Sequence, residues 1–282
     1  MPEKPTTFEG YPPGQVQLVH SACLTLATRV GDLIEDLVIV GGVAPSLLIP
    51  QEEAAEGHVG TLDLDVGLSV ALLDSQRYQV LAERLRTEGF RPEPNAKGNP
   101  ARQTWALEGH GRVTLDFLIP PSLEGDRGGR LRNIEPDFAA FIIPGLDLAF
   151  RDRRWVELSG WTLRGDRATR RIPVCGPGSF VVLKALAFRM RGEPKDAYDL
   201  VYVLRFFGQE PVAEVAQPLG TLLDHPSARE ALDYLAADFD GPDALGPGGY
   251  ARFLGDPTSD ALRQDAAGAV RLLLRLLPLG QE

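Results

Sequence analysis

The order of hydrophobic and polar residues predicts the first elements of the chain. Apolar residues from 15 to about 36 recur at alternating spacings of three and four, which is the period of an amphipathic helix. The apolar run Leu37-Val38-Ile39-Val40 then predicts a short buried strand that stops at Gly41-Gly42. Pro45 marks the start of the next helix, because proline is favoured at the first helical position.

The next segment, from Gly60 to Val66, reads as a strand with two faces. Polar Thr61, Asp63 and Asp65 alternate strictly with apolar Leu62, Leu64 and Val66. Successive side chains of a strand point to opposite faces, so both carboxylates share one face while the leucines face the core. Two parallel carboxylates repel each other, and a divalent metal with oxygen ligands is a common remedy. An amphipathic strand with a solvated acidic face has the same pattern.

A third acid lies in a predicted β-hairpin. Residues 102–108 and 112–119 form its two strands, around Gly109-His110-Gly111. In the second strand Asp116 lies on the face opposite to four apolar residues: Val113, Leu115, Phe117 and Ile119. Asp116 is therefore either a solvated strand position or a third carboxylate beside the first two, if the two strands are neighbours.

The remaining pattern predicts a sheet followed by helices. We expect a domain boundary at Gly176-Pro177-Gly178. Before it the pattern predicts a helix from Asp74 to Gly89, a strand and loop over 90–98, a loop over 120–136, and strands near 146–150, 154–159 and 171–175. Beyond it we expect a helix over 180–191 with Ser179 as its N-cap, helices over 195–207, 211–223, 227–238 and 258–277, and Gly/Pro breaks at 241–249. The predicted domains are residues 1–175 and 176–282.

Two of these helices carry charges among apolar residues. Lys184 lies in the predicted helix 180–191, where a surface lysine with an apolar stem has the same pattern as a functional one. Asp196 and Asp199 are three residues apart and hence share one helical face. An acid in a first turn also complements the helix dipole, so both interpretations stay open.

Composition narrows the classes of protein. The net charge of −10 argues against non-specific nucleic-acid binding over the whole surface. Arginines nevertheless cluster locally, as Arg127/Arg130/Arg132, Arg151/Arg153/Arg154 and Arg164/Arg167/Arg170/Arg171. They are either solvated loop residues or a basic face for a phosphate-rich partner. Two cysteines, no signal peptide and no long apolar run predict a cytoplasmic protein without a disulfide framework or membrane span.

Taken together, these motifs resemble a known superfamily. A strand with Gly-Gly, a Thr-x-Asp-x-Asp segment and a third Asp on a strand are similar to nucleotidyltransferases with the polymerase β-like fold. Residues 183–189 and 195–200 resemble the second signature of the AbiEii/MenT branch, toxins of bacterial toxin–antitoxin and phage-defence systems. The resemblance, over residues 35–205, implies an α+β fold with a mixed sheet flanked by helices and a C-terminal helical domain.

The resemblance also implies roles for individual residues. Gly41, Gly42 and Thr61 would bind the nucleotide, Asp63, Asp65 and Asp116 would hold Mg²⁺ or Mn²⁺, Lys184 would contact the triphosphate, and Asp196 would complete the site. Asp116 would also act as general base on an acceptor hydroxyl. Two departures concern basic residues: His58-Val59-Gly60 stands where many members have Arg or Lys, and Lys195 where Arg is common.

The implied function is Mg²⁺-dependent transfer of a nucleotide from an NTP to RNA, such as the 3′ end of a tRNA, with growth arrest as the outcome. A cognate antitoxin would then be a partner. The same fold also serves a small-molecule acceptor of the aminoglycoside kind, which the acidic composition favours slightly, or a protein acceptor. A nucleotide-binding module without transfer activity is the third alternative.

Overall fold

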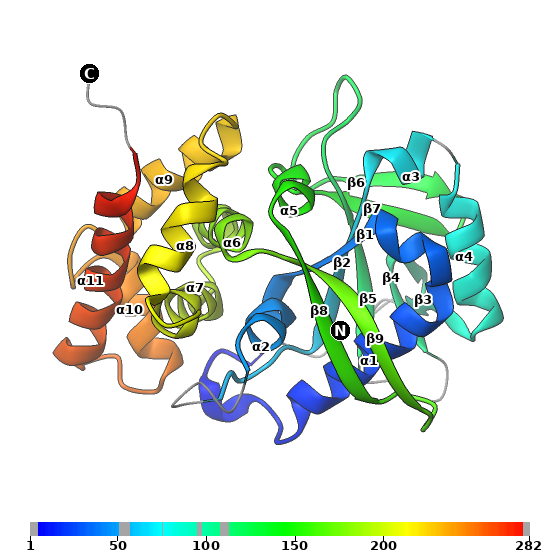
Figure 1. The fold of residues 1–282 in the computed structure, drawn as a ribbon, viewed down its shortest axis with the longest axis horizontal. Helices are drawn as coiled ribbons and strands as arrows, with labels where there is room; N and C mark the ends of the chain where they lie inside the picture. Colours follow the sequence, from blue (N-terminus) through cyan, green and yellow to red (C-terminus); the bar gives the residue numbers. More distant parts are fainter. Residues whose placement is uncertain (1–4, 51–56, 75, 95–97, 108–112, 279–282) are drawn as a thin grey trace. The chain divides into compact units, whose positions relative to one another are not determined.

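The computed structural model of the chain describes residues 5–50, 57–74, 76–94, 98–107 and 113–278 (Figure 1). The predicted turn at 109–111 lies outside these residues. The described residues form two compact units. The first consists of 14–44, 60–74, 76–94, 98–107 and 113–175, and the second of 5–13, 45–50, 57–59 and 176–278.

The first unit is built on one mixed sheet. Its strands are β1 (Leu37–Val40), β2 (Asp63–Leu68), β3 (Phe90–Pro94), β4 (Pro100–Leu107), β5 (Thr114–Ile119), β6 (Leu131–Glu135), β7 (Phe138–Ile142), β8 (Arg153–Trp161) and β9 (Arg167–Cys175). The order is β3-β4-β5-β2-β1-β9-β8, with β7 beside β5 and β6 beside β7. The pairs β2–β5, β1–β9 and β5–β7 are parallel, and the other pairs are antiparallel. The predicted α+β class with a mixed sheet is therefore confirmed.

Helices accompany this sheet in the first unit. They are α1 (Gln15–Val30), α3 (Val70–Asp74), α4 (Tyr78–Thr87) and α5 (Asp147–Arg151), with short 3₁₀ turns at Gly31–Asp36 and Gly41–Val43. All four residues of β1 are buried, as an apolar strand between two neighbours requires. The helix predicted from Asp74 to Gly89 corresponds to the last residue of α3 and the whole of α4. Gly89 lies two residues beyond the end of α4 and has a φ of +88°.

Two predictions for the first unit are wrong. The run 146–150, expected as a strand, forms most of α5. Its alternation of Leu146, Leu148 and Phe150 fits a strand, but Leu146 and Ala149 are both fully buried at the helical spacing of three. The expected loop 120–136 contains β6, whose residues are exposed or half-buried and therefore lack the apolar pattern of a core strand.

The second unit is helical. Its helices are α6 (Pro177–Arg191), α7 (Pro194–Phe206), α8 (Pro211–Gly220), α9 (Pro226–Asp238), α10 (Leu245–Phe253) and α11 (Asp260–Leu276), with a 3₁₀ turn at Phe8–Gly10; α2 (Ala44–Leu48) spans the division between the units. Proline occupies the first position of α6 to α9, where its missing N–H is not needed. No helix in the described part of the chain is long and apolar enough to cross a membrane.

Two helix predictions for the second unit need correction. The N-cap of α6 is Gly176, and Ser179 lies in the first turn with its hydroxyl donating to the carbonyl of Gly176 at 3.1 Å. Helix α10 begins at Leu245, inside the stretch 241–249 expected as Gly/Pro breaks. A Cβ on Gly246 would come within 2.4 Å of the Phe239 ring, so close packing rather than chain flexibility explains this glycine.

Candidate metal centre

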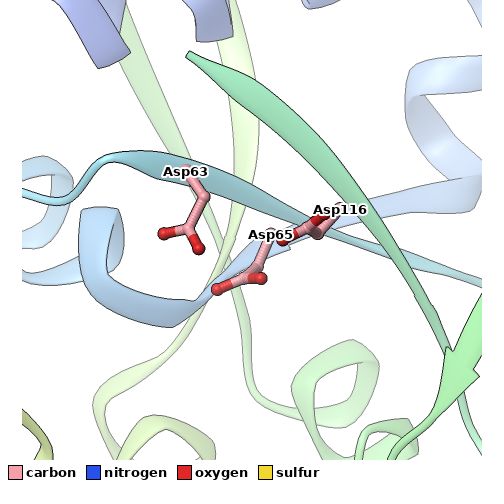
Figure 2. A group of neighbouring side chains, drawn as sticks. All are labelled: Asp63, Asp65 and Asp116. Atoms are coloured by element: carbon pink, nitrogen blue, oxygen red, sulfur yellow. The ribbon is translucent and has the colours of Figure 1, made fainter. Parts of the chain in front are cut away.

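The three predicted acids come together on one face of the sheet. Asp63 and Asp65 belong to β2 and Asp116 to β5, and these strands are parallel neighbours with Asp65 in register with Asp116 (Figure 2). One carboxylate oxygen from each residue lies within 4.8 Å of the others. The condition that the sequence left open, that the two strands are adjacent, is met. The strand itself begins at Asp63, so Thr61 and Leu62 precede it.

Burial excludes the solvated-face interpretation for two of these acids. Asp63 is 6% exposed and Asp116 is 9% exposed, while Asp65 is half-buried. Three like charges at this distance repel strongly where water is largely excluded. Their ligand atoms are all carboxylate oxygens, the type that Mg²⁺ and Mn²⁺ prefer over nitrogen or sulfur. The donor set therefore fits a hard divalent cation.

The glycine turn after β1 leaves the space that Asp65 occupies. β1 pairs antiparallel with β2, with Val40 in register with Asp65. Gly41 has a φ of +72°, and a Cβ added to it would lie 1.9 Å from Oδ2 of Asp65. Only glycine satisfies both the left-handed backbone and this approach. The turn at Gly41-Gly42 thus lies directly beside the acidic cluster.

A buried hydrogen-bond chain fixes the first acid. The Thr61 hydroxyl donates to Oδ1 of Asp63 at 2.7 Å, and the Gln15 side-chain amide donates to the Thr61 carbonyl at 2.8 Å. Thr61 and Gln15 are both buried. We predicted Thr61 as a nucleotide-binding residue, and the structure gives it a contact with the carboxylate. Gln15 was not predicted, since a single amide at the start of a helix carries no signal.

A second charged cluster lies within the helical unit. Lys184 of α6 donates to Oδ1 of Asp196 at 2.8 Å and to Oδ2 of Asp199 at 2.7 Å. Its side chain is 8% exposed and those of the two acids of α7 are 1% and 0% exposed. Lys184 is therefore a buried ion-pair partner and not a surface lysine with an apolar stem.

Three further residues, Arg191, Lys195 and His58, contact these acids. Together with Lys184, Asp196 and Asp199 they form what we call the ionic cluster. Arg191 donates twice to Asp196, each time at 2.6 Å. Lys195 donates to both oxygens of Asp199, at 2.7 and 3.0 Å. Nε2 of His58 lies 2.9 Å from Oδ1 of Asp199, and its ring stacks on Tyr198 at 5.3 Å. In the sequence, His58 stands out only as a departure from the family pattern.

The electrostatics of this cluster follow from burial and pairing. Burial lowers the pKa of His58 to about 4 and outweighs the opposite effect of Asp199. For Lys184, burial opposes the charged form, but Asp196 and Asp199 raise its pKa above the usual range. For Asp199, burial is overcome by Lys184 and Lys195, which hold its pKa well below the usual range. The acids and Lys184 are thus charged at neutral pH and His58 is neutral.

Comparison with known proteins identifies no family for the chain. No protein-family model matches it, and no curated protein sequence is similar to it. A solved structure with some likeness is an antigenic nucleotidyltransferase-like protein from Paracoccidioides brasiliensis, at 16% identity and a TM-score of 0.38, covering 79% of this chain and 94% of that one. A likeness at this level establishes neither a shared fold family nor an activity.

Proposed function

We propose that this chain is a metal-dependent nucleotidyltransferase that moves a nucleotide from an NTP to an RNA acceptor. The observation that carries the proposal is the cluster of Asp63, Asp65 and Asp116 on two adjacent strands, with ligand oxygens within 4.8 Å of one another. The glycine turn at Gly41-Gly42 beside this cluster supports it. When bound, Mg²⁺ or Mn²⁺ would offset the negative charge of the triphosphate and of the transition state.

Each residue of the site has a proposed task. Asp63, Asp65 and Asp116 would hold the cation, and Thr61 keeps the Asp63 carboxylate oriented through its hydrogen bond. The turn at Gly41-Gly42 would let phosphate oxygens approach the backbone, because no Cβ stands in the way.

The transfer itself needs a proton acceptor. Asp116 would take the proton from the acceptor hydroxyl, whose oxygen forms a bond to the α-phosphorus. The bond between the α-phosphorus and the bridging oxygen breaks, and pyrophosphate leaves. The roles of Lys184 at the triphosphate and of Asp196 in completing the site rest on the sequence resemblance alone. So do the tRNA 3′ end as acceptor, growth arrest and a cognate antitoxin.

Incubation with NTPs and RNA tests the proposal. The protein is incubated with each NTP labelled at the α-phosphate, Mg²⁺ or Mn²⁺, and total RNA. We expect label in RNA with at least one NTP, and loss of transfer in Asp63→Asn and Asp65→Asn. Asp240→Asn is the matched control, because Asp240 is an exposed acid of the helical unit. Label on a small molecule or protein instead of RNA would contradict the RNA acceptor.

Metal binding is measured separately by calorimetry with Mn²⁺. The wild type should bind, and Asp65→Asn should bind at least tenfold more weakly, since it loses a charged ligand. Binding without transfer to any acceptor would indicate a non-catalytic module. Unaltered Mn²⁺ binding in both aspartate variants would overturn the metal assignment.

A further inference from the structure

Two of the arginine clusters singled out in the sequence meet on the antiparallel pair β8–β9. Glu157 is in register with Arg171, Ser159 with Thr169 and Trp161 with Arg167. Directly opposed residues of an antiparallel pair share a face, and every second residue along a strand shares it too. Arg153, Trp155, Trp161, Arg167 and Arg171 therefore lie on one face of the strand pair, which we call the ribbon face.

The opposite face of this ribbon is covered by α1. A Cβ on Gly160, which would point to that side, lies 3.3 Å from the Leu24 side chain of α1. The backbone N–H of Leu163, in the turn after β8, donates to the Thr25 hydroxyl at 2.8 Å. The ribbon face thus points away from α1, and Trp161 on it is 59% exposed. An indole of that exposure contributes nothing to a core.

Arginines and indoles are paired along the ribbon face. The guanidinium of Arg153 lies 5.1 Å from the Trp155 ring centroid, and that of Arg171 lies 5.5 Å from the same ring. The guanidinium of Arg167 lies 5.6 Å from the Trp161 ring. These cation–π contacts hold planar cations and planar aromatic rings side by side.

The charge of this face is opposite to that of the protein. Three arginines and one acid, Glu157, lie on it, and Arg153 also pairs with the Glu35 carboxylate at 3.7 Å, so the face stays net positive while the whole chain has a net charge of −10. The two tryptophans are six residues apart on one strand, which corresponds to about 20 Å at the usual rise. Such a stripe is long enough to follow an extended polymer.

We propose that the ribbon face binds single-stranded RNA, with the arginines on phosphates and bases stacked on Trp161 and Trp155. Single-stranded nucleic acid is recognised by positive charge along the backbone combined with exposed aromatic rings. An acidic protein would use the arginines but not the indole faces, and a duplex keeps its bases stacked on one another. The choice of RNA rests on the proposed function, for which this face would supply the acceptor.

Fluorescence anisotropy tests this with a labelled, unstructured single-stranded RNA, without NTP or divalent metal. We expect Trp161→Leu and Arg167→Gln each to weaken binding about tenfold, which is the usual effect of losing one stacked base or one charge-assisted contact. The control is Arg252→Gln, which removes an exposed arginine of α10 and should leave binding unchanged. RNA should also quench tryptophan fluorescence in the wild type, since Trp105 is fully buried and the other two tryptophans lie on this face.

Competition identifies the partner. Inorganic polyphosphate, poly-glutamate and double-stranded RNA should each displace the labelled strand less well than unlabelled single-stranded RNA. Equal displacement by polyphosphate, with unchanged binding in Trp161→Leu, would reduce the face to a simple cationic surface and overturn the proposal. Stronger displacement by poly-glutamate would assign it to an acidic protein and also overturn it. If the protein binds RNA but transfers no nucleotide, the proposed function is refuted and the ribbon proposal stands. If it transfers nucleotides but Trp161→Leu and Arg167→Gln bind RNA as the wild type does, the ribbon proposal is refuted and the proposed function stands.

Discussion

Loss of Asp199 from the ionic cluster should be among the most destabilising single changes in the helical unit. Its side chain is fully buried and accepts hydrogen bonds from Lys184, Lys195 and His58 at 2.7 to 3.0 Å. The substitution Asp199→Asn keeps the shape of the side chain and one acceptor oxygen. It removes the negative charge, so the test isolates electrostatics from packing.

The expected magnitude follows from the charges that remain. The cluster holds three cations, Lys184, Lys195 and Arg191, against two anions, Asp196 and Asp199. After the substitution three cations face one anion. Removing one partner of a buried ion pair costs about 3–5 kcal/mol, mostly through the charge left behind. That is a large part of a typical free energy of unfolding of about 5–15 kcal/mol.

Urea unfolding at pH 7 measures this loss. Asp240→Asn, at an exposed position, should stay within about 0.5 kcal/mol of the wild type. Adding Lys195→Met to Asp199→Asn should restore part of the stability, because the second change removes a cation that the first left uncompensated. A loss below about 1 kcal/mol in Asp199→Asn, or no recovery in the double variant, would show that water compensates these charges and that the reasoning is wrong.

Three further results are expected. Gly41→Ala should weaken Mn²⁺ binding in calorimetry, since the new Cβ displaces the Asp65 carboxylate. It should also cost about 1–2 kcal/mol in urea unfolding, because alanine is strained at a positive φ. The control Gly129→Ala, at a φ of +74° with open space around it, should leave Mn²⁺ binding unchanged. The folded protein should lose up to about 3 kcal/mol of stability as pH falls from 6.5 toward 4, because the unfolded chain protonates His58 near 6.5 and the folded chain only near 4. His58→Gln should remove that share of the slope, and an identical slope would refute it. Burial raises the pKa of the Cys23 thiol to about 12, so a maleimide should label it only after unfolding, and rapid labelling of the folded protein would contradict this burial.

Local periodicity predicted those elements whose two faces differ in polarity. β2 shows this best, because Leu64 and Val66 are fully buried on one face while Asp63 and Asp65 lie on the other. The pattern fails where packing does not depend on it. The residues of β6 are exposed or half-buried, and α10 packs against α7 and α11, with Gly246 leaving room for the Phe239 ring. Neither circumstance leaves a periodic signal in the sequence.

The same distinction applies to the side chains around the two clusters. The shared face of Asp63 and Asp65 is a property of six consecutive residues, so the sequence could predict it. The contacts of the supporting residues span long stretches of chain, 46 residues between Gln15 and Thr61 and 141 between His58 and Asp199. No pattern in one sequence encodes such a pairing.

Burial is what makes the acidic cluster more than an amphipathic strand. A solvated acidic face needs contact with water, and Asp63 and Asp116 are at most 9% exposed. The Thr61 hydroxyl neutralises no charge, so it orients Asp63 without offsetting repulsion among the three acids. Gly41 leaves the space that the Asp65 carboxylate occupies in the cluster, and any other residue there would be strained and would displace this carboxylate. On the proposed function, a cation that shares the oxygens of these three acids would offset their mutual repulsion, as nucleotidyl transfer requires.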